Sequence, residues 1–175
     1  MAKKIYIKTI LIALVVLLLS SCATTNKDGS PKWTTNVPND RKTYYGVGYA
    51  KLSNIQNSKM RAEAAAIDDI ARRVSVTVKG ALTNYFQDSE TITGVNIDMT
   101  EGISHQIVDV SLRGIHVDKI WVDAEQGVWA LVSFPVKNLK AAYKEQSEKL
   151  QRETEIAKSE LLIEYLEKEL AKEGK

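Results

Sequence analysis

The sequence predicts an α+β fold: a small antiparallel sheet of about four strands with helices packed on one side, in the order β-α-β-(α)-β-β-α, plus a long C-terminal helix. Three observations support this class. Residues 43–50 are rich in aromatic and β-branched side chains, residues 53–73 have apolar positions at helical spacing, and residues 115–134 contain two strand-like runs around a polar loop. Strands and helices that do not alternate regularly are typical of α+β proteins.

An export signal is predicted at the start of the chain. Lys3, Lys4 and Lys8 supply positive charge, and residues 9–19 are apolar apart from the first of them, before two small serines. This is the layout of a secretory signal. A membrane-spanning helix needs roughly twenty apolar residues, and this run has about eleven. We therefore expect residues 1–21 to be a cleaved signal rather than a retained anchor.

A lipid-attachment site is predicted directly after the signal. Leu19, Ser20, Ser21 and Cys22 resemble the lipobox of bacterial lipoproteins, in which the cysteine thiol receives a diacylglyceryl group and the new amine is acylated. Cys22 is the only cysteine among the 175 residues. A buried CH₂ contributes about 0.8 kcal/mol, so two or more acyl chains hold a protein stably on a membrane. Ala23 follows in place of an aspartate, so the resemblance implies the outer membrane, with the leaflet left open.

The composition argues against nucleic acid as a partner. Removing residues 1–21 takes away three lysines and no acids, which changes the formal net charge from +2 to about −1. Binding to polyanions depends on many Lys and Arg side chains that neutralise phosphates. With no cysteine after Cys22, no internal disulfide can form, so apolar burial must hold the fold.

Two segments precede the first predicted strand. Residues 23–32 are polar and show no apolar period, which predicts a tether; ten such residues span very roughly 17–19 Å as a flexible coil. Residues 33–41 predict an irregular entry segment that ends in a turn. We interpret Trp33 as a packed aromatic side chain, with an interfacial membrane anchor as the alternative.

The first strand is predicted over residues 43–50, which read TYYGVGYA. Gly46 and Gly48 invite comparison with nucleotide-binding loops. A dinucleotide fingerprint needs a third glycine at the start of a helix, and no glycine follows here until Gly80. We therefore interpret the two glycines as positions where a helix packs closely on the strand.

That helix is predicted over residues 53–73. Ser53 and Gln56 have the spacing of a capping box. An apolar stripe rich in alanine, which lets a helix lie close to a sheet, follows helical spacing at Met60, Ala64, Ile67, Ala71 and Val74. Asp68 and Asp69 point about 100° apart on a helix, so we interpret them as part of a solvated face rather than as a catalytic pair.

A long half-buried strand is predicted over residues 74–87. Val74, Val76, Val78, Leu82 and Phe86 fall on one face at a period of two, against polar residues on the other face. Gly80 is in phase with them and is interpreted as a bulge. This segment supplies the extra strand of the predicted sheet.

A helix is predicted over residues 97–112, after a turn at residues 88–96. Apolar residues at helical spacing support it, at Met99, Ile103, Ile107 and Val110. Gly102 weakens the helix, and a strand is the alternative.

A hairpin is predicted from the strands 115–122 and 128–134, separated by the loop Asp-Ala-Glu-Gln-Gly. Trp121 and Trp129 flank the loop and are expected to pack on the sheet or across the hairpin. Pro135 ends the second strand.

One long charged helix is predicted over residues 138–172. Its second half contains apolar residues that a small domain does not necessarily cover, at Leu161, Leu162, Ile163, Tyr165 and Leu166. An exposed apolar stripe indicates a partner. The alternative, a helix folded back on its own domain, has equal support.

No catalytic or metal-binding pattern is present in the sequence. His105 and His116 stand alone, without a ligand spacing such as HExxH. There is no Gly-x-Ser-x-Gly elbow, no Walker A loop and no second cysteine to act as a nucleophile. Spacing selects no pair among the carboxylates Asp88, Asp109, Asp118 and Asp123. We therefore expect no catalytic residues, no metal, no cofactor and no enzymatic activity.

A spaced set of motifs resembles the LPP-twenty lipoprotein family. In order, the motifs are the lipobox, Pro31-x-Trp33, Pro38, Tyr45-Gly46-Val47-Gly48-Tyr49-Ala50, the alanine-rich helix running into Arg73-Val74-Ser75-Val76-Thr77-Val78-Lys79, Leu112-x-Gly114, and the hairpin from Lys119-x-Trp121-Val122-Asp123 to Trp129-Ala130-Leu131-Val132. The resemblance covers roughly residues 12–145. It implies a small α+β body and an outer-membrane lipoprotein, with no catalytic residues to carry over. One branch of the family helps to build structures around the flagellar motor; this chain departs from that pattern in its helix after about Gln146.

Four regions are therefore predicted: a signal at 1–21, a tether at 22–32, an α+β domain at 33–146 and a charged helical extension at 147–175. The leading hypothesis is a non-enzymatic lipoprotein, anchored through Cys22, that serves in envelope assembly or adhesion. It would contact another protein or its own copies through the sheet edge or the C-terminal helix. The alternative is a periplasmic module that binds a small ligand or cell-wall fragment in a cleft between sheet and helices.

Overall fold

The structure is a computed structural model that describes residues 25–88, 97–154 and 158–175. The chain divides into two compact units, Met1–Asn36 and Val37–Lys175.

The described part of the first unit is a hydrogen-bonded turn followed by a short 3-10 helix, η2 (Lys32–Thr34). The carboxylate of Asp28 accepts hydrogen bonds from both the amide and the hydroxyl of Ser30, and these bonds lower the pKa of Asp28. Trp33 is buried, as predicted for a packed aromatic side chain.

The second unit is built on a three-stranded antiparallel sheet. Its strands are β1 (Thr43–Ala50), β2 (His116–Val122) and β3 (Val128–Pro135), in the spatial order β1-β3-β2. The predicted strand bounds are confirmed to within one residue at each end. The sheet has three strands and not the four predicted, because the segment after Arg73 is not a strand.

The predicted strand at 74–87 is wrong: this segment continues the helix α2 (Ile55–Asp88). Val74, Val78 and Leu82 are buried at a spacing of four, which fits both a helix and a strand. Val76 distinguishes a helix from a strand here. A strand would bury Val76 beside Val74, whereas the helix leaves it 71% exposed. Burial of one helical face here overrides the β-propensity of the valines.

The cap of α2 also differs from the predicted capping box. Asn54 precedes the helix, and its Oδ1 accepts hydrogen bonds from the backbone N–H groups of Gln56 at 2.7 Å and Asn57 at 3.3 Å. Asparagine is among the best residues at this position. The helix therefore starts one residue later than Ser53 would place it.

The glycines of β1 set the distance between strand and helix, as predicted. A Cβ added at Gly46 would lie 2.2 Å from the carbonyl oxygen of Ala66, and one added at Gly48 would lie 2.0 Å from that of Ala62. Such contacts are impossible for a real side chain. Glycine on β1 and alanine on α2 therefore let the backbones of strand and helix touch.

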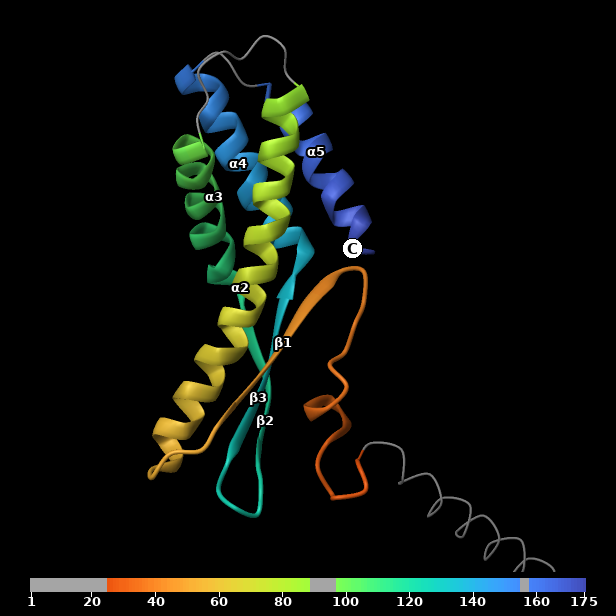
Figure 1. Cartoon of the computed structure of the whole chain (residues 1–175), viewed down its shortest axis with the longest axis vertical. Helices are drawn as coiled ribbons and strands as arrows, with labels where there is room; N and C mark the ends of the chain where they lie inside the picture. Colours follow the sequence, from red (N-terminus) through yellow and green to blue (C-terminus); the bar gives the residue numbers. More distant parts are fainter. Residues whose placement is uncertain (1–24, 89–96, 155–157) are drawn as a thin grey trace, which may run out of the picture. The chain divides into compact units, whose positions relative to one another are not determined.

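The second half of α2 belongs to a four-helix arrangement that extends beyond one end of the sheet (Figure 1). The other three helices are α3 (Ile97–Ser111), α4 (Val136–Thr154) and α5 (Ser159–Lys172); α3 and α5 pack on α2, and α4 packs on α3 and α5. The helix predicted over 97–112 is confirmed as α3, which runs into a 3-10 turn, η3 (Leu112–Gly114).

The single long C-terminal helix that was predicted is wrong, because α4 and α5 are separate helices. α5 packs back against both α2 and α4 and buries Leu162, Leu166 and Leu170 to 1% exposure or less. The backbone N–H of Lys158, just before α5, donates to Tyr85 Oη on α2 at 2.8 Å. Of the apolar residues predicted to need a partner here, Leu162 and Leu166 are covered by the domain itself, as in the folded-back alternative, whereas Leu161 stays 41% exposed.

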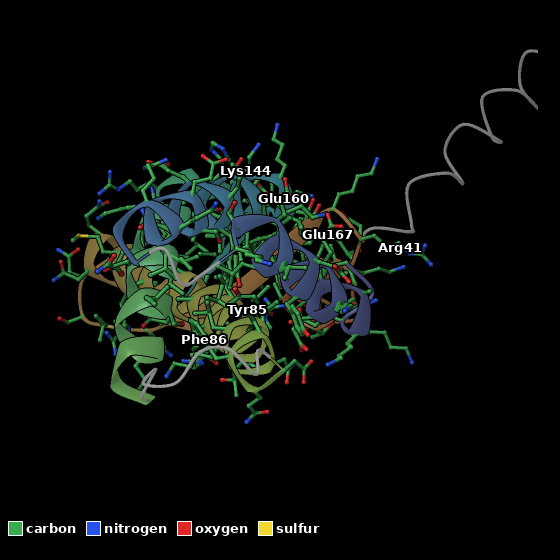
Figure 2. All side chains as sticks on the ribbon, turned by 90° about the horizontal axis from the view of Figure 1, so that it is seen from above. Arg41, Tyr85, Phe86, Lys144, Glu160 and Glu167 are labelled. Carbon is green, nitrogen blue, oxygen red and sulfur yellow. The ribbon has the colours of Figure 1, made fainter. Side chains whose placement is uncertain are left out.

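Viewed from above, Figure 2 shows Tyr85 and Phe86 on α2 and places Lys144 on α4 and the acids Glu160 and Glu167 on α5. The last three side chains are exposed, and they form part of the charged outer surface of the two C-terminal helices. The high charge that marks this part of the sequence therefore serves the solvated side of the bundle, while the leucines of α5 fill its core.

Candidate functional site

The predicted lipid-attachment residue, Cys22, lies outside the described residues, as does the signal at 1–21. In the ranges that the structure does describe, no helix is both long and apolar enough to cross a bilayer. The candidate sites below therefore all belong to the second unit.

The carboxylates considered as a catalytic pair have separate partners. Asp88 accepts a hydrogen bond from Tyr165 Oη at 2.6 Å, and Asp118 accepts one from Ser133 Oγ at 2.9 Å. Asp123 accepts the N–H groups of its own hairpin loop, at 2.9 and 2.7 Å. Each of these three carboxylates is occupied in a local contact, and none of these contacts joins two of them.

The histidines are placed on different elements. His105 is exposed on α3, as is Asp109, and His116 is exposed on the edge strand β2. Among the described residues, no group of three or more His, Cys, Asp or Glu side chains could hold a metal ion.

A pocket of about 550 Å³ opens beside β1 and α2, where the segment after α5 returns to the sheet. Its lining combines apolar and charged side chains: Val37, Pro38, Asn39, Tyr45, Asp69, Arg72, Arg73, Val76, Glu173 and Lys175. A module that binds a small ligand between sheet and helices would hold its ligand here.

Lys175, in the wall of this pocket, is fully engaged. Its ammonium donates to Asn39 Oδ1 at 3.2 Å, to the Asp40 carbonyl at 2.7 Å and to the Thr43 carbonyl at 2.8 Å, which uses all three of its donors. Burial lowers the pKa of Lys175. The lysine ties the end of the described chain to the start of β1.

The other charged groups of the pocket are also bound to the protein. Arg73 donates to the Tyr45 carbonyl and, at 3.0 Å, to Asp69 Oδ2. Glu173 accepts from Tyr44 Oη at 2.9 Å and from the Thr77 hydroxyl. The pocket therefore has a clear structural role, in which charged side chains clasp the segment after α5 onto β1 and α2.

Two buried tyrosines provide a test of this clasp. Tyr44→Phe removes the bond to Glu173, so we expect a loss of about 1–2 kcal/mol in the free energy of unfolding. Tyr143→Phe is the matched control, because the Tyr143 hydroxyl is buried without a partner in the described part of the chain, and its removal is expected to be neutral or stabilising. Urea unfolding of both variants, followed by circular dichroism, measures the difference. Equal losses would contradict a role for the clasp.

A second pocket, of about 440 Å³, is lined by five basic side chains. They are Arg41, Lys42, Lys137, Lys140 and Lys175, with Thr43, Pro135 and Val136 between them. No basic stripe marks this site in the sequence, because these cations come from three segments that are far apart along the chain. Only the pairing of β1 with β3 and the return of α5 bring them together.

An exposed apolar strip lies on β2. Val117, Ile120 and Val122, here called the hairpin strip, are 46%, 37% and 41% exposed. In the register of the sheet they align with Val132, Ala130 and Val128 of β3, and so lie on the face that carries Gly46 and Gly48. α2 packs on β1 and β3 of that face, which leaves the β2 side chains uncovered.

The opposite face of the sheet carries an aromatic row at the same end of the hairpin. Tyr49, Trp129 and Trp121 occupy matching positions on the three strands, and the Tyr49 and Trp129 rings have centroids 4.7 Å apart at an angle of 45°. Trp121 and Trp129 are thus cross-strand neighbours in the hairpin, and Trp129 packs on Tyr49 of the sheet.

Both edges of the sheet resist pairing with another strand. β2 has an irregularity between Val117 and Lys119, and a bulge together with an edge lysine discourages strand addition. On the other edge, Arg73 and Lys175 occupy the carbonyls of Tyr45 and Thr43. The hairpin strip is therefore better placed to contact a partner through side chains than through the backbone.

The second unit is a small α+β body, as the resemblance to a lipoprotein family implies. The sequence model of a family described as LPP20 lipoprotein matches residues 31–134. Because this match spans more than half of the 175 residues, the chain belongs to the LPP20 lipoprotein family, and a place in the bacterial cell envelope follows. A comparison with curated proteins finds no match.

Proposed function

We propose that this chain is a non-enzymatic lipoprotein, held in the outer membrane by lipid on Cys22, that works by binding another envelope protein or further copies of itself. The observation that carries the proposal is the hairpin strip. Family membership supports the anchor and the compartment, and the exposed side chains of β2 support an interaction surface.

The folded-back helix α5 narrows the choice of surface. The sequence alone leaves the sheet edge and the C-terminal helix as candidates, and three of the four leucines of α5, Leu162, Leu166 and Leu170, are buried in its own bundle. Burying a fully exposed Val or Ile side chain contributes about 1.5–3 kcal/mol. The three residues of the strip are 37–46% exposed, so a partner that covers them gains roughly half of that value for each.

Site-specific photo-cross-linking in cells tests this proposal. A photoreactive amino acid replaces Ile120, which is 37% exposed, and in a matched control it replaces Leu161 of α5, which is 41% exposed. We expect light to produce a discrete adduct from position 120 and none from position 161. Mass spectrometry of the adduct then separates a second copy of the chain from another envelope protein.

Two results would contradict the proposal. One is the absence of any adduct from positions 117, 120 and 122, and the other is an equal yield of adducts from position 161. The mass of the mature protein from membrane fractions, with Cys22→Ala as the control, tests the anchor separately, because only an acylated cysteine adds the mass of its acyl chains.

A further inference from the structure

The five cations of the second pocket, here called the basic pocket, are concentrated where the second unit begins. Arg41 and Lys42 precede β1, Lys137 and Lys140 lie in the first turns of α4, and Lys175 follows α5. No acidic side chain lines this pocket. The mature chain has a net charge near −1, yet five positively charged side chains lie together in this pocket.

Some of these charges are already paired. Lys140 contacts Glu167 of α5 at 2.7 Å, with both side chains about half exposed, and Lys175 donates to three oxygens of the chain. Arg41, Lys42 and Lys137 are exposed, and across the described ranges no carboxylate forms an ion pair with any of the three. Arg41 points away from the body in Figure 2. Three solvated, uncompensated cations thus surround a concave site.

The chemistry of the site fits a phosphate group. The guanidinium of an arginine matches phosphate oxygens in two-point hydrogen bonds, and lysines add point charges around it. Pro135 and Val136 in the lining offer apolar contact. A phosphodiester with a short apolar stem therefore matches the cations and the apolar residues of this lining. A metal ion or another cationic ligand would be repelled by the same cations.

The position of the basic pocket in the chain identifies the source of the phosphate. The second unit starts at Val37, so Arg41 and Lys42 belong to the first folded residues after the segment that leads from Cys22. With lipid on Cys22, Arg41 and Lys42 are the members of the basic pocket that lie nearest to the anchor along the chain. A basic cluster near a bilayer gains about 1 kcal/mol for each Lys or Arg at an anionic surface.

We infer that the basic pocket docks the second unit on the membrane by binding the phosphate headgroup of anionic lipids. This inference rests on the proposed lipid anchor for its setting. Anchoring by acyl chains fixes only one point of the protein, whereas headgroup binding at the basic pocket also fixes the orientation of the unit. The hairpin strip is then presented in a constant direction.

Vesicle binding of an unlipidated chain tests the inference. The mature chain, residues 22–175 with Cys22→Ser, is mixed with vesicles of phosphatidylcholine alone or with about 30 mol% phosphatidylglycerol, and sedimentation measures the bound fraction. We expect binding only to the anionic vesicles, with an affinity that falls as salt rises. Replacing the three unpaired cations, in Arg41→Gln, Lys42→Gln and Lys137→Gln combined, is expected to weaken it at least about tenfold.

A charge-matched variant serves as the control. Arg61→Gln, Arg113→Gln and Arg152→Gln together remove three exposed arginines that lie outside the basic pocket, and we expect affinity within about twofold of the parent chain. Equal weakening in both triple variants would overturn the inference, because net charge alone would then account for binding. Equal binding of the parent to neutral vesicles would also overturn it.

Free phosphate is distinguished from lipid in the same assay. Glycerol 3-phosphate at constant ionic strength is expected to displace the chain from vesicles only at high concentration. If the chain bound glycerol 3-phosphate tightly and did not bind anionic vesicles, the assignment to lipid would be overturned. Because the assay uses no acyl chain and no cross-link, its failure is separate from failure of the proposed function.

Discussion

Gly48→Val is expected to cost at least about 3 kcal/mol in the free energy of unfolding. Overpacking a well-filled site costs about 1–3 kcal/mol when side chains can move aside. Here the atom that a Cβ would meet is the backbone carbonyl of Ala62, at 2.0 Å, with the backbone nitrogen of Ala66 at 2.6 Å. Backbone atoms of a helix cannot turn away as a side chain can, so α2 would have to lift off β1.

Urea unfolding followed by circular dichroism measures this loss, with Gly102→Ala as the control. Gly102 lies in the helix α3, and a Cβ added there meets nothing within 4 Å, so alanine is expected to stabilise the protein by up to about 1 kcal/mol through its higher helix propensity. If valine at position 48 left stability unchanged, the close contact between strand and helix would be wrong.

The elements that the sequence predicted well have a local cause. β1 and the hairpin are each marked by aromatic and β-branched runs between turn residues, and those signals do not depend on any distant partner. The close contact at Gly48 was also predictable, because glycine inside a strand marks a close approach of another backbone and an alanine-rich helix follows directly. Family resemblance then agreed with the same residues.

The end of α2 could not be predicted in the same way, because the spacing of its buried residues fits two kinds of secondary structure. Val74, Val78 and Leu82 are four residues apart, and a spacing of four is a multiple of the strand period as well as close to one helical turn. Val76 lies midway between Val74 and Val78, and this spacing of two favoured a strand. Only the presence of other helices, which bury one side of this segment and leave Val76 in solvent, decides the matter.

The basic pocket was missed for a related reason. Arg41, Lys137 and Lys175 lie in three segments that are far apart along the sequence, so no single segment contains the cluster. Their proximity depends on the register of β1 with β3 and on the reversal between α4 and α5. The sequence leaves this reversal open, since a charged stretch with leucines on one side fits a straight helix and a folded-back pair equally well.

Leu166→Ala is expected to cost about 2–5 kcal/mol, the range for a large apolar side chain removed from a core. Leu166 is 1% exposed and belongs to the same buried cluster as Val78 of α2 and Phe134 of β3. Leu161→Ala is the control from the same helix, because Leu161 is 41% exposed, and it is expected to change stability by less than about 0.5 kcal/mol.

Comparison of the two leucine variants tests more than one side chain. The family match ends at residue 134, so α4 and α5 both follow the matched region, yet they complete the core that its residues begin. A large loss for Leu166→Ala in a single cooperative transition would mean that the matched sheet and the C-terminal helices unfold together. A small loss, or separate transitions for the two parts, would mean that α5 is a detachable helix whose apolar side is free to bind a partner. The burial of Leu162, Leu166 and Leu170 argues for the first result, and the hairpin strip then remains the surface that we propose for contact with a partner.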